Sequence, residues 1–462
     1  MIDFGYINAF NNGNGQRDSF EDLMCVLARR NPPVSALEFQ PNEGSGGDGG
    51  VEAIWLLANG KKIGYQAKFF LTLGDSQWRQ IDESVQQALE VHPELQKYII
   101  ALPRDLTPDR GGKSRGKSER QKWDERVVKW KKLAATKAIN IEFELWSATT
   151  LKEMLLREEN TSLVKHWFGG DVLNDKWFEN QIDVAAQTLD DRFNPGDHVE
   201  VSIEGLFDTI VRGPVTSKRL RDAFSEIEKS VVPDIQLTSA ANMPDADVIL
   251  KANNSWQKLV ELKSSFSQDF TNEWDIDLAS TTLDHLKDAV WKLERKLTSI
   301  KKEDIEEGDQ SKVENISQNL NALSSSCEAL RKILRDPKLQ AEAQKCAVVY
   351  GPAGAGKSHI LGQIAEQRTR ADLPTVLVLG QSLSNSVFWE QICGVLGLEG
   401  RTVDDVLGNL NAAGERKGVR TILLFDAINE GVGAQYWRQN LPEVVNAIQR
   451  HSHLAAVFSC RE

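Results

Sequence analysis

A glycine-rich segment with the letters G-P-A-G-A-G-K-S, Gly351–Ser358, lies between a short apolar run and a stretch compatible with a helix. Its glycines, among them Gly354 and Gly356, let backbone N–H groups approach a β-phosphate, and the following helix adds its positive end. We expect Lys357 to reach the β- and γ-phosphates and the Ser358 hydroxyl to bind Mg²⁺. The segment therefore predicts a site for ATP or GTP with Mg²⁺.

Two later segments carry residue types that would complete such a site. The apolar run Thr421–Phe425 ends in Asp426, an acid that suits a Mg²⁺ ligand. Glu430 follows in D-A-I-N-E and either orients the attacking water or is a solvated loop acid. A further apolar run, Leu454–Ser459, leads to Arg461, which either senses the γ-phosphate or is an ordinary surface arginine.

The D-A-I-N-E element and the strand that ends in S-C-R resemble the STAND class of signal-transducing NTPases, which includes NACHT proteins and apoptotic ATPases. The resemblance covers Lys345–Glu462. Members of this class continue with a last sheet strand, a lid, a winged-helix module and a repeat sensor. We therefore expect residues 341–462 to be the N-terminal part of an incomplete NTPase domain in a longer protein.

A second candidate site lies near the N-terminus, where a glycine-rich turn feeds two strands joined by an Asn-Gly turn. The first strand carries Glu52 and the second carries Gln66-x-Lys68. Hydrolysis of a phosphodiester needs a divalent metal held by oxygens and a cation that stabilises the developing charge. Glu52, the backbone of Ala67 and Lys68 meet that need.

This hairpin resembles the PD-(D/E)xK restriction-endonuclease superfamily, and within it the Mrr-like enzymes, in which Q-x-K often replaces E-x-K. The match covers roughly residues 15–157, and it implies that Glu21 in the first helix supports the metal. Mrr-like sequences commonly have an aspartate where this chain has Glu52. Asp48 therefore competes with Glu52 for the role of main metal ligand, and Gln66 and Lys68 complete the implied catalytic set.

The length of the hairpin loop decides which face of the sheet the acid occupies, because side chains alternate along a strand. A two-residue turn at Asn59 and Gly60 would leave Glu52 facing away from Gln66. A three-residue loop that begins at Ala58, with Gly60 in a left-handed bulge, places Glu52 opposite Gln66. We predict the three-residue loop.

Residues 110–137 form a basic segment with eleven Lys and Arg against three acids. Such a segment suits contact with the DNA backbone, although a solvated helix face is the alternative. We expect Trp123 and Trp130 of this segment to be core residues and not platforms for base stacking. The expected DNA contacts are Lys113, Arg115, Lys117, Arg120 and Lys122.

The elements around these sites predict a multidomain α/β protein. The expected arrangement is a restriction-endonuclease-like domain at 1–160, a mainly helical connector at 161–340 and the P-loop NTPase domain at 341–462. The connector shows helical spacing, with possible strands at His198–Ile203 and Val248–Lys251. The predicted N-terminal helices are Asp18–Arg30, Gln77–Leu89, Glu119–Ala135 and Leu151–Arg157, and the predicted strands are Val51–Leu57, Lys62–Phe70, Lys97–Leu102 and Ile141–Ser147.

Composition limits the classes of function. A formal net charge of −12 over 462 residues argues against a protein that coats nucleic acid along its whole surface. Five scattered cysteines without a C-x-x-C pair fit a reducing compartment. Since no apolar run is long enough to span a bilayer, we expect a cytoplasmic bacterial protein with no membrane partner.

The order nuclease-like domain, helical connector and STAND-type NTPase resembles the bacterial antiviral STAND proteins, called Avs or bacterial NLR-like defence proteins. The resemblance implies that a C-terminal sensor, absent from this chain, recognises a phage protein. ATP-bound modules then assemble into a homo-oligomer, expected to be a tetramer, whose nuclease domains cut double-stranded DNA with Mg²⁺. Two alternatives stay open, an NTP-dependent restriction-type nuclease or translocase and a non-enzymatic NTP-switched scaffold.

Overall fold

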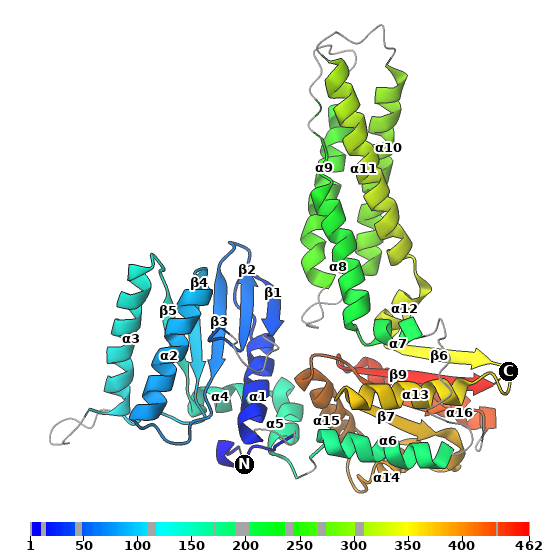
Figure 1. Cartoon of the computed structure of the whole chain (residues 1–462). Helices are drawn as coiled ribbons and strands as arrows, with labels where there is room; N and C mark the ends of the chain where they lie inside the picture. Colours follow the sequence, from blue (N-terminus) through cyan, green and yellow to red (C-terminus); the bar gives the residue numbers. More distant parts are fainter. Residues whose placement is uncertain are drawn as a thin grey trace. The chain divides into compact units, whose positions relative to one another are not determined.

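The chain has a multidomain α/β fold that divides into two compact units, one formed by Met1–Val199 with Lys345–Glu462 and the other by Glu200–Gln344 (Figure 1). Each unit is described by itself. The computed structural model describes residues 2–10, 15–41, 49–108, 117–170, 172–189, 204–233, 235, 244–266, 274–300, 309–430 and 433–461.

The first sheet of the larger unit has the strand order β1-β2-β3-β4-β5. The first three strands are antiparallel to one another, and β3, β4 and β5 are parallel. The four strands expected from the sequence are confirmed, while β1 was not predicted. Their bounds are β1 Ala36–Pro41, β2 Ala53–Leu57, β3 Lys62–Ala67, β4 Leu95–Ala101 and β5 Glu142–Trp146.

Helices bury both faces of this sheet. One face packs Tyr65 and Trp146 with α1, α4 and α5, and the other packs Ile54 and Tyr98 with α2 and α3. Trp123 and Trp130 are each 3% exposed in the second core, which confirms that they are core residues. The helices are α1 Gln16–Arg30, α2 Asp75–Val91, α3 Glu119–Thr136, α4 Ala148–Leu155 and α5 Thr161–Phe168.

The second sheet of the same unit is wholly parallel, with the order β6-β9-β8-β7. Strand β9 therefore lies between β6, which precedes the glycine-rich loop, and β8, which ends in Asp426. The strands are β6 Cys346–Gly351, β7 Thr375–Leu379, β8 Thr421–Asp426 and β9 Leu454–Arg461. The helices around them are α6 Asp175–Leu189, α13 Lys357–Arg370, α14 Phe388–Val395, α15 Val403–Arg416 and α16 Gly433–Gln449.

The smaller unit is helical, and α8, α9, α10 and α11 run alongside one another as a bundle in Figure 1. The leucines with helical spacing, such as Leu286 and Leu323, are buried in its core, as predicted. An ion pair between Arg212 and Glu342, 2.6 Å long and nearly fully buried, joins the two ends of this unit. Its helices are α7 Glu204–Ile210, α8 Pro214–Lys229, α9 Ala246–Leu262, α10 Ile276–Ser299, α11 Gln310–Leu334 and α12 Pro337–Gln344.

One expectation for this region is wrong. The segment Val248–Lys251 is not a strand but part of α9, where Ala252 and Leu259 recur at helical spacing and are fully buried. The other suggested strand, His198–Ile203, lies outside the described residues. Among the described helices, none has the length and apolar character needed to cross a membrane.

Candidate nucleotide site and candidate nuclease site

The glycine-rich segment forms a loop between β6 and α13. Gly354 and Gly356 have φ values of +75° and +76°, in a region that L side chains rarely adopt. Among the described residues, nothing lies within 4 Å of a Cβ built at either glycine, so conformation and not crowding requires glycine there. Helix α13 begins at Lys357, directly after the loop. The local sequence thus builds a loop followed by a helix start, a geometry that suits a phosphate group.

A cavity of about 260 Å³ lies over this loop. Three segments that are distant in the sequence line it, namely the loop with the start of α13, the residues after β8 and the end of β9. Because β9 lies between β6 and β8, the carboxyl ends of these parallel strands meet at one edge of the sheet. The lining residues are Gly354, Ala355, Gly356, Lys357, Ser358, His359, Ala427, Glu430, Ser459 and Arg461.

The Lys357 side chain folds back over the loop. Its Nζ donates hydrogen bonds to the backbone oxygens of Gly351 and Pro352, each 2.7 Å away. These neutral acceptors hold the ammonium group at the loop without cancelling its charge. A phosphate group would offer the ammonium stronger, charge-assisted acceptors.

Asp426 is held behind the cavity wall and is 2% exposed. Its Oδ1 accepts a 2.6 Å hydrogen bond from the Ser459 hydroxyl, and Ser459 Oγ accepts one from the Ala427 N–H at 2.7 Å. Gly380 makes room for this turn, because a Cβ there would lie 2.4 Å from the Ala427 oxygen. Sequence reasoning missed Ser459 and Gly380, although Ser459 belongs to the S-C-R motif. Together they orient the Asp426 carboxylate.

The two residues with open roles, Glu430 and Arg461, contact each other. Arg461 Nη2 lies 2.6 Å from Glu430 Oε1, and both side chains line the cavity. Asn429 supports the pair, because its side chain exchanges hydrogen bonds of 3.1 and 3.3 Å with the backbone of Arg461. The pair lies beside the phosphate loop, with the Arg461 side chain 44% exposed and the Glu430 side chain 19% exposed.

In the N-terminal hairpin the three-residue loop is confirmed. Ala53 pairs with Tyr65, and the Leu57 N–H donates to the Lys61 oxygen at 2.9 Å, which leaves three residues between them. Gly60 has a φ of +74°, the left-handed conformation that this loop requires. The register therefore places Glu52 opposite Gln66, and the two-residue turn is excluded.

Gln66 connects Glu52 to the interior of the domain. Its Nε2 donates to Glu52 Oε1, and its Oε1 lies 3.4 Å from the Tyr98 hydroxyl oxygen. That hydroxyl donates its one hydrogen to the backbone oxygen of Gly50, at the end of the glycine-rich turn. Gln66 and Tyr98 are 1% and 0% exposed. A buried chain of hydrogen bonds thus orients the Glu52 carboxylate, and sequence reasoning did not find Tyr98.

We expect Tyr98→Phe to lower the free energy of unfolding by about 1–3 kcal/mol, because the buried Gly50 oxygen loses a donor. Urea denaturation followed by tryptophan fluorescence measures this change. Tyr65→Phe is the matched control, since Tyr65 lies on the opposite face of the same sheet. Equal stability of the two variants would contradict the orienting role of Tyr98.

Lys68 lies two residues beyond Gln66, and its N–H still pairs with Ala101 of β4 at 3.0 Å. The alternation of side chains along this ladder puts Lys68 on the face of Gln66 and Glu52. Glu21 of α1 accepts a 2.9 Å ion pair from Arg17. The pKa of Arg17 is raised mainly by the hydrogen bond and the charge of Glu21, with a smaller contribution from the charge of Glu52.

Both sites offer the oxygen ligands that Mg²⁺ prefers, and Mg²⁺ retains several waters when bound. At the nucleotide site the donors are Ser358 and the oriented Asp426. At the hairpin the donor is Glu52, held by Gln66. Glu21 lies on α1 and pairs with Arg17, and Asp48 lies outside the described residues. Within the described part of the chain, no three His, Cys, Asp or Glu side chains are placed to hold a metal alone. Each site therefore fits a cation that water or phosphate oxygens also coordinate.

The predicted DNA contacts on the basic segment are already paired with acids where they are described. Lys117 pairs with Glu125 at 2.6 Å, Arg120 with Asp124 at 3.2 Å and Lys122 with Asp75 at 3.8 Å. Exposed pairs of this kind are weak and leave the side chains free to exchange partners. Two further predicted contacts, Lys113 and Arg115, lie outside the described residues.

The larger unit thus holds two separate groups of the residues expected from the sequence. One surrounds the loop at Gly351–Ser358, and the other surrounds the pair Glu52 and Gln66. No protein-family model and no curated protein matches the chain, so the assignment of both sites rests on their residues and geometry.

Proposed function

We propose that this chain is an ATP-controlled, Mg²⁺-dependent endonuclease that cuts double-stranded DNA in antiphage defence. The observation that carries the proposal is the cavity of about 260 Å³, which gathers Lys357, Ser358, Glu430 and Arg461 from three distant segments. The same compact unit contains the hairpin with Glu52 and Gln66. One unit with a phosphate-binding site and a carboxylate site supports an enzyme whose cutting depends on nucleotide.

The pair of Glu430 and Arg461 supports a switch at the γ-phosphate. The guanidinium of Arg461 is held by the Glu430 carboxylate. A γ-phosphate in the cavity competes for that guanidinium, because its oxygens are stronger acceptors. Release of Arg461 then leaves Glu430 available to orient the attacking water. ATP and ADP would therefore leave this edge of the sheet in different states.

At the hairpin each residue has a distinct role in phosphodiester hydrolysis. Glu52 and Glu21 hold Mg²⁺, which polarises the phosphate when it is bound. Gln66 keeps the Glu52 carboxylate in place through its hydrogen bond. Lys68, on the same face, stabilises the charge that develops on the phosphate. The Lys68 ammonium also favours the ionised form of an attacking water.

Control by assembly fits the charge of the chain. A net charge of −12 disfavours binding of a single copy to DNA, and the basic segment offers only local contacts. When a phage protein triggers formation of a homo-oligomer, expected to be a tetramer, several basic segments bind the same DNA together. The gain in avidity then brings the cutting residues to the duplex.

A non-enzymatic scaffold switched by nucleotide is the second candidate. The ion pairs of Lys117, Arg120 and Lys122 favour it, because each predicted DNA contact that is described already has an acidic partner. In that case the hairpin domain would bind a protein partner, and the nucleotide site would still be required.

A plasmid-cleavage assay on the natural full-length protein distinguishes these functions. We expect supercoiled plasmid to be cut only when Mg²⁺, ATP and lysate from phage-infected cells are all present. Cutting at the same rate without ATP would contradict nucleotide control, and absence of cutting in a phage-protective protein would favour the scaffold. Continuous ATP turnover that needs DNA and no lysate would instead indicate a translocase.

A further inference from the structure

The N-terminal sheet and the P-loop sheet of the larger unit have separate hydrophobic cores. The N-terminal sheet has one core on each face, and their described members come from residues 4–167, with one addition, Ala412 of α15. The core of the P-loop sheet is built from residues 173–458. Apolar packing therefore contributes little to the contact between the two folds, and that contact is mostly polar.

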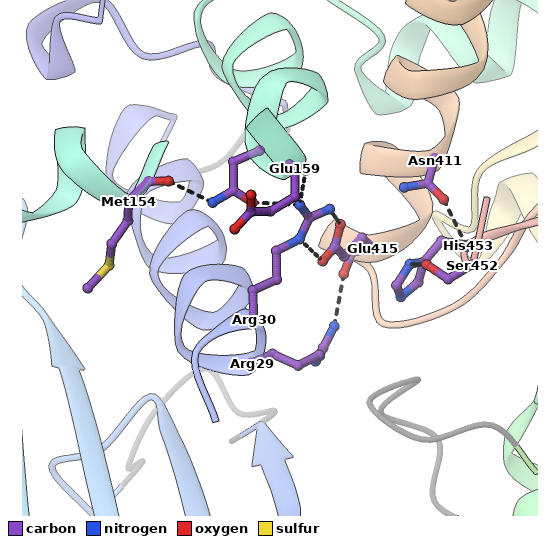
Figure 2. Close-up of polar contacts among 9 residues, drawn as sticks. Arg29, Arg30, Met154, Glu159, Asn411, Glu415, Ser452 and His453 are labelled. Carbon is purple, nitrogen blue, oxygen red and sulfur yellow. Dashed lines mark hydrogen bonds and ion pairs between the residues drawn. The ribbon is translucent and has the colours of Figure 1, made fainter. Parts of the chain in front are cut away.

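The centre of this contact is an ion pair between the end of α1 and the end of α15 (Figure 2). Arg30 forms a two-point pair with Glu415, through Nε at 2.7 Å and Nη2 at 2.6 Å. Arg29 donates to the Glu415 backbone oxygen at 3.2 Å. The third nitrogen of the Arg30 guanidinium, Nη1, donates to the Glu159 backbone oxygen at 2.7 Å and to Asn160 Oδ1 at 2.6 Å. The Glu415 side chain is only 3% exposed, so its charge depends on these arginines.

A second set of charges flanks the first. Arg416, whose side chain is 2% exposed, lies 3.7 Å from Asp22 of α1 and 2.8 Å from Asp175 of α6. Its guanidinium also lies over the Phe10 ring, 4.6 Å from the centroid. Lys417 pairs with Asp175 at 3.2 Å. Asp22 is the neighbour in sequence of Glu21, a predicted residue of the nuclease site.

Helix α5 continues the contact along α15. Lys165 pairs with Asp405, and the ring of His166 lies 2.5 Å from the Asn409 side chain. These contacts are also polar. From Asp405 to Arg416, one face of α15 therefore carries polar side chains that bond to residues of the nuclease-like fold.

The other face of α15 is tied to the strands that lead to the nucleotide site. Thr421, the first residue of β8, donates to the Leu410 oxygen at 2.7 Å, and the His453 N–H donates to Asn411 at 2.8 Å. A Cβ at Gly414 would lie 2.7 Å from the His453 oxygen, so the helix packs closely on this edge. Helix α15 cannot move without moving the starts of β8 and β9.

The far ends of those two strands carry Asp426 and Arg461, two of the predicted nucleotide-site residues. On the other side of the contact, α1 carries Glu21 and Arg17 of the candidate nuclease site. Among the described elements, β8 and β9 with α15, and then α1, form a continuous connection between the two candidate sites. A change at the γ-phosphate has a path of packed backbone to the Arg30–Glu415 pair.

We infer that α15 is a docking surface that holds the nuclease domain and that releases it when ATP binds. This inference rests on the proposed function. Interfaces made of charges and small residues open at lower cost than apolar cores. A shift of α15 by about 1–2 Å, typical of helix movements at interfaces, breaks the two-point geometry of Arg30 on Glu415. The released domain is then free to assemble with other copies.

Hydrogen exchange on the full-length protein tests the inference with three variants, Glu415→Gln, Arg30→Gln and the double variant. We expect either single change to raise amide exchange about tenfold in α1 and α15 without nucleotide, because a charge-assisted pair is lost. The double variant should add little, since both changes remove the same interaction. In wild type, ATP should produce the same local increase.

Controls separate undocking from unfolding. Glu366→Gln removes a surface ion pair with Arg370 on α13 and should leave exchange unchanged. If a variant also lost protection from exchange in β3 and β8, that variant would be unfolded. The effect of ATP on exchange in the wild-type protein would then be the test of the docking surface. If ATP left amide exchange in α1 and α15 of the wild-type protein unchanged, the inference would be wrong.

A cleavage assay on the same samples keeps the two proposals distinct. We expect Glu415→Gln to cut plasmid with ATP but without infected-cell lysate, at least about tenfold faster than wild type under those conditions. If ATP raised exchange in α1 and α15 but the protein never cut DNA, the nuclease proposal would be wrong and the docking surface would stand. If the triggered protein cut DNA but ATP left exchange unchanged, the docking surface would be wrong and the nuclease proposal would stand.

Discussion

Lys357→Ala is expected to weaken binding of ATP by at least about a hundredfold. The ammonium group makes charge-assisted hydrogen bonds to two phosphates, each worth about 1.5–3 kcal/mol, and about 1.4 kcal/mol corresponds to tenfold in affinity. Lys357 is held at the loop by the backbone oxygens of Gly351 and Pro352. Isothermal titration with ATP and Mg²⁺ measures the loss, and DNA cutting should disappear with it.

Arg370→Ala is the matched control for this variant. Arg370 lies at the other end of α13, and its side chain is 71% exposed. Removing it changes the charge of the same helix by the same amount without touching the cavity. If ATP bound the Lys357→Ala protein and the wild-type protein with equal affinity, this loop would not be the nucleotide site.

Lys68→Ala and Glu52→Gln are each expected to lower the rate of plasmid cleavage by a factor on the order of 10³, with ATP affinity unchanged. A positioned group that stabilises or protonates a reacting oxygen contributes factors of about 10²–10⁴. Glu52 is fixed by Gln66, and the register puts Lys68 on the same face, so neither has a nearby substitute on the hairpin. Initial rates of plasmid linearisation measure the effect.

Lys61→Ala, at the exposed tip of the same hairpin, controls for the loss of a lysine. Full protection against phage by the Lys68→Ala protein would favour the scaffold over the nuclease. If Glu52→Gln still cut DNA while Asp48→Asn did not, Asp48 would be the main metal ligand. The hairpin would then still belong to the nuclease site, with Asp48 and not Glu52 as the main metal ligand.

Most of the secondary structure around the sites could be predicted from the sequence, because it follows from local patterns. The hairpin loop is an example, since the Asn59-Gly60 signal and the alternation of side chains selected the three-residue form. Strand β1 escaped notice because only Phe39 of its six residues is buried, so its apolar pattern is weak. Strand β7 has a clear apolar run directly after Pro374, and the prediction from the sequence did not include it.

The strand expected at Val248–Lys251 shows where local preference fails. Val248 and Ile249 are β-branched residues that favour strands. The longer helical spacing of Ala252, Trp256 and Leu259 lets this segment bury an apolar face in the bundle. Burial along a whole helix outweighs the preference of two residues.

The sequence by itself determined the loop at Gly351–Ser358 and the helix that follows it, because the residues involved are consecutive and their backbone conformations are local. It also indicated that Glu52 and Lys68 belong together. Only the tertiary structure decided how Ser459 orients Asp426, that Arg461 and Glu430 form a pair, and that Arg30 binds Glu415. These partners lie between 31 and 385 residues apart, and contacts at such separations depend on how strands are ordered and helices packed. No local pattern records them.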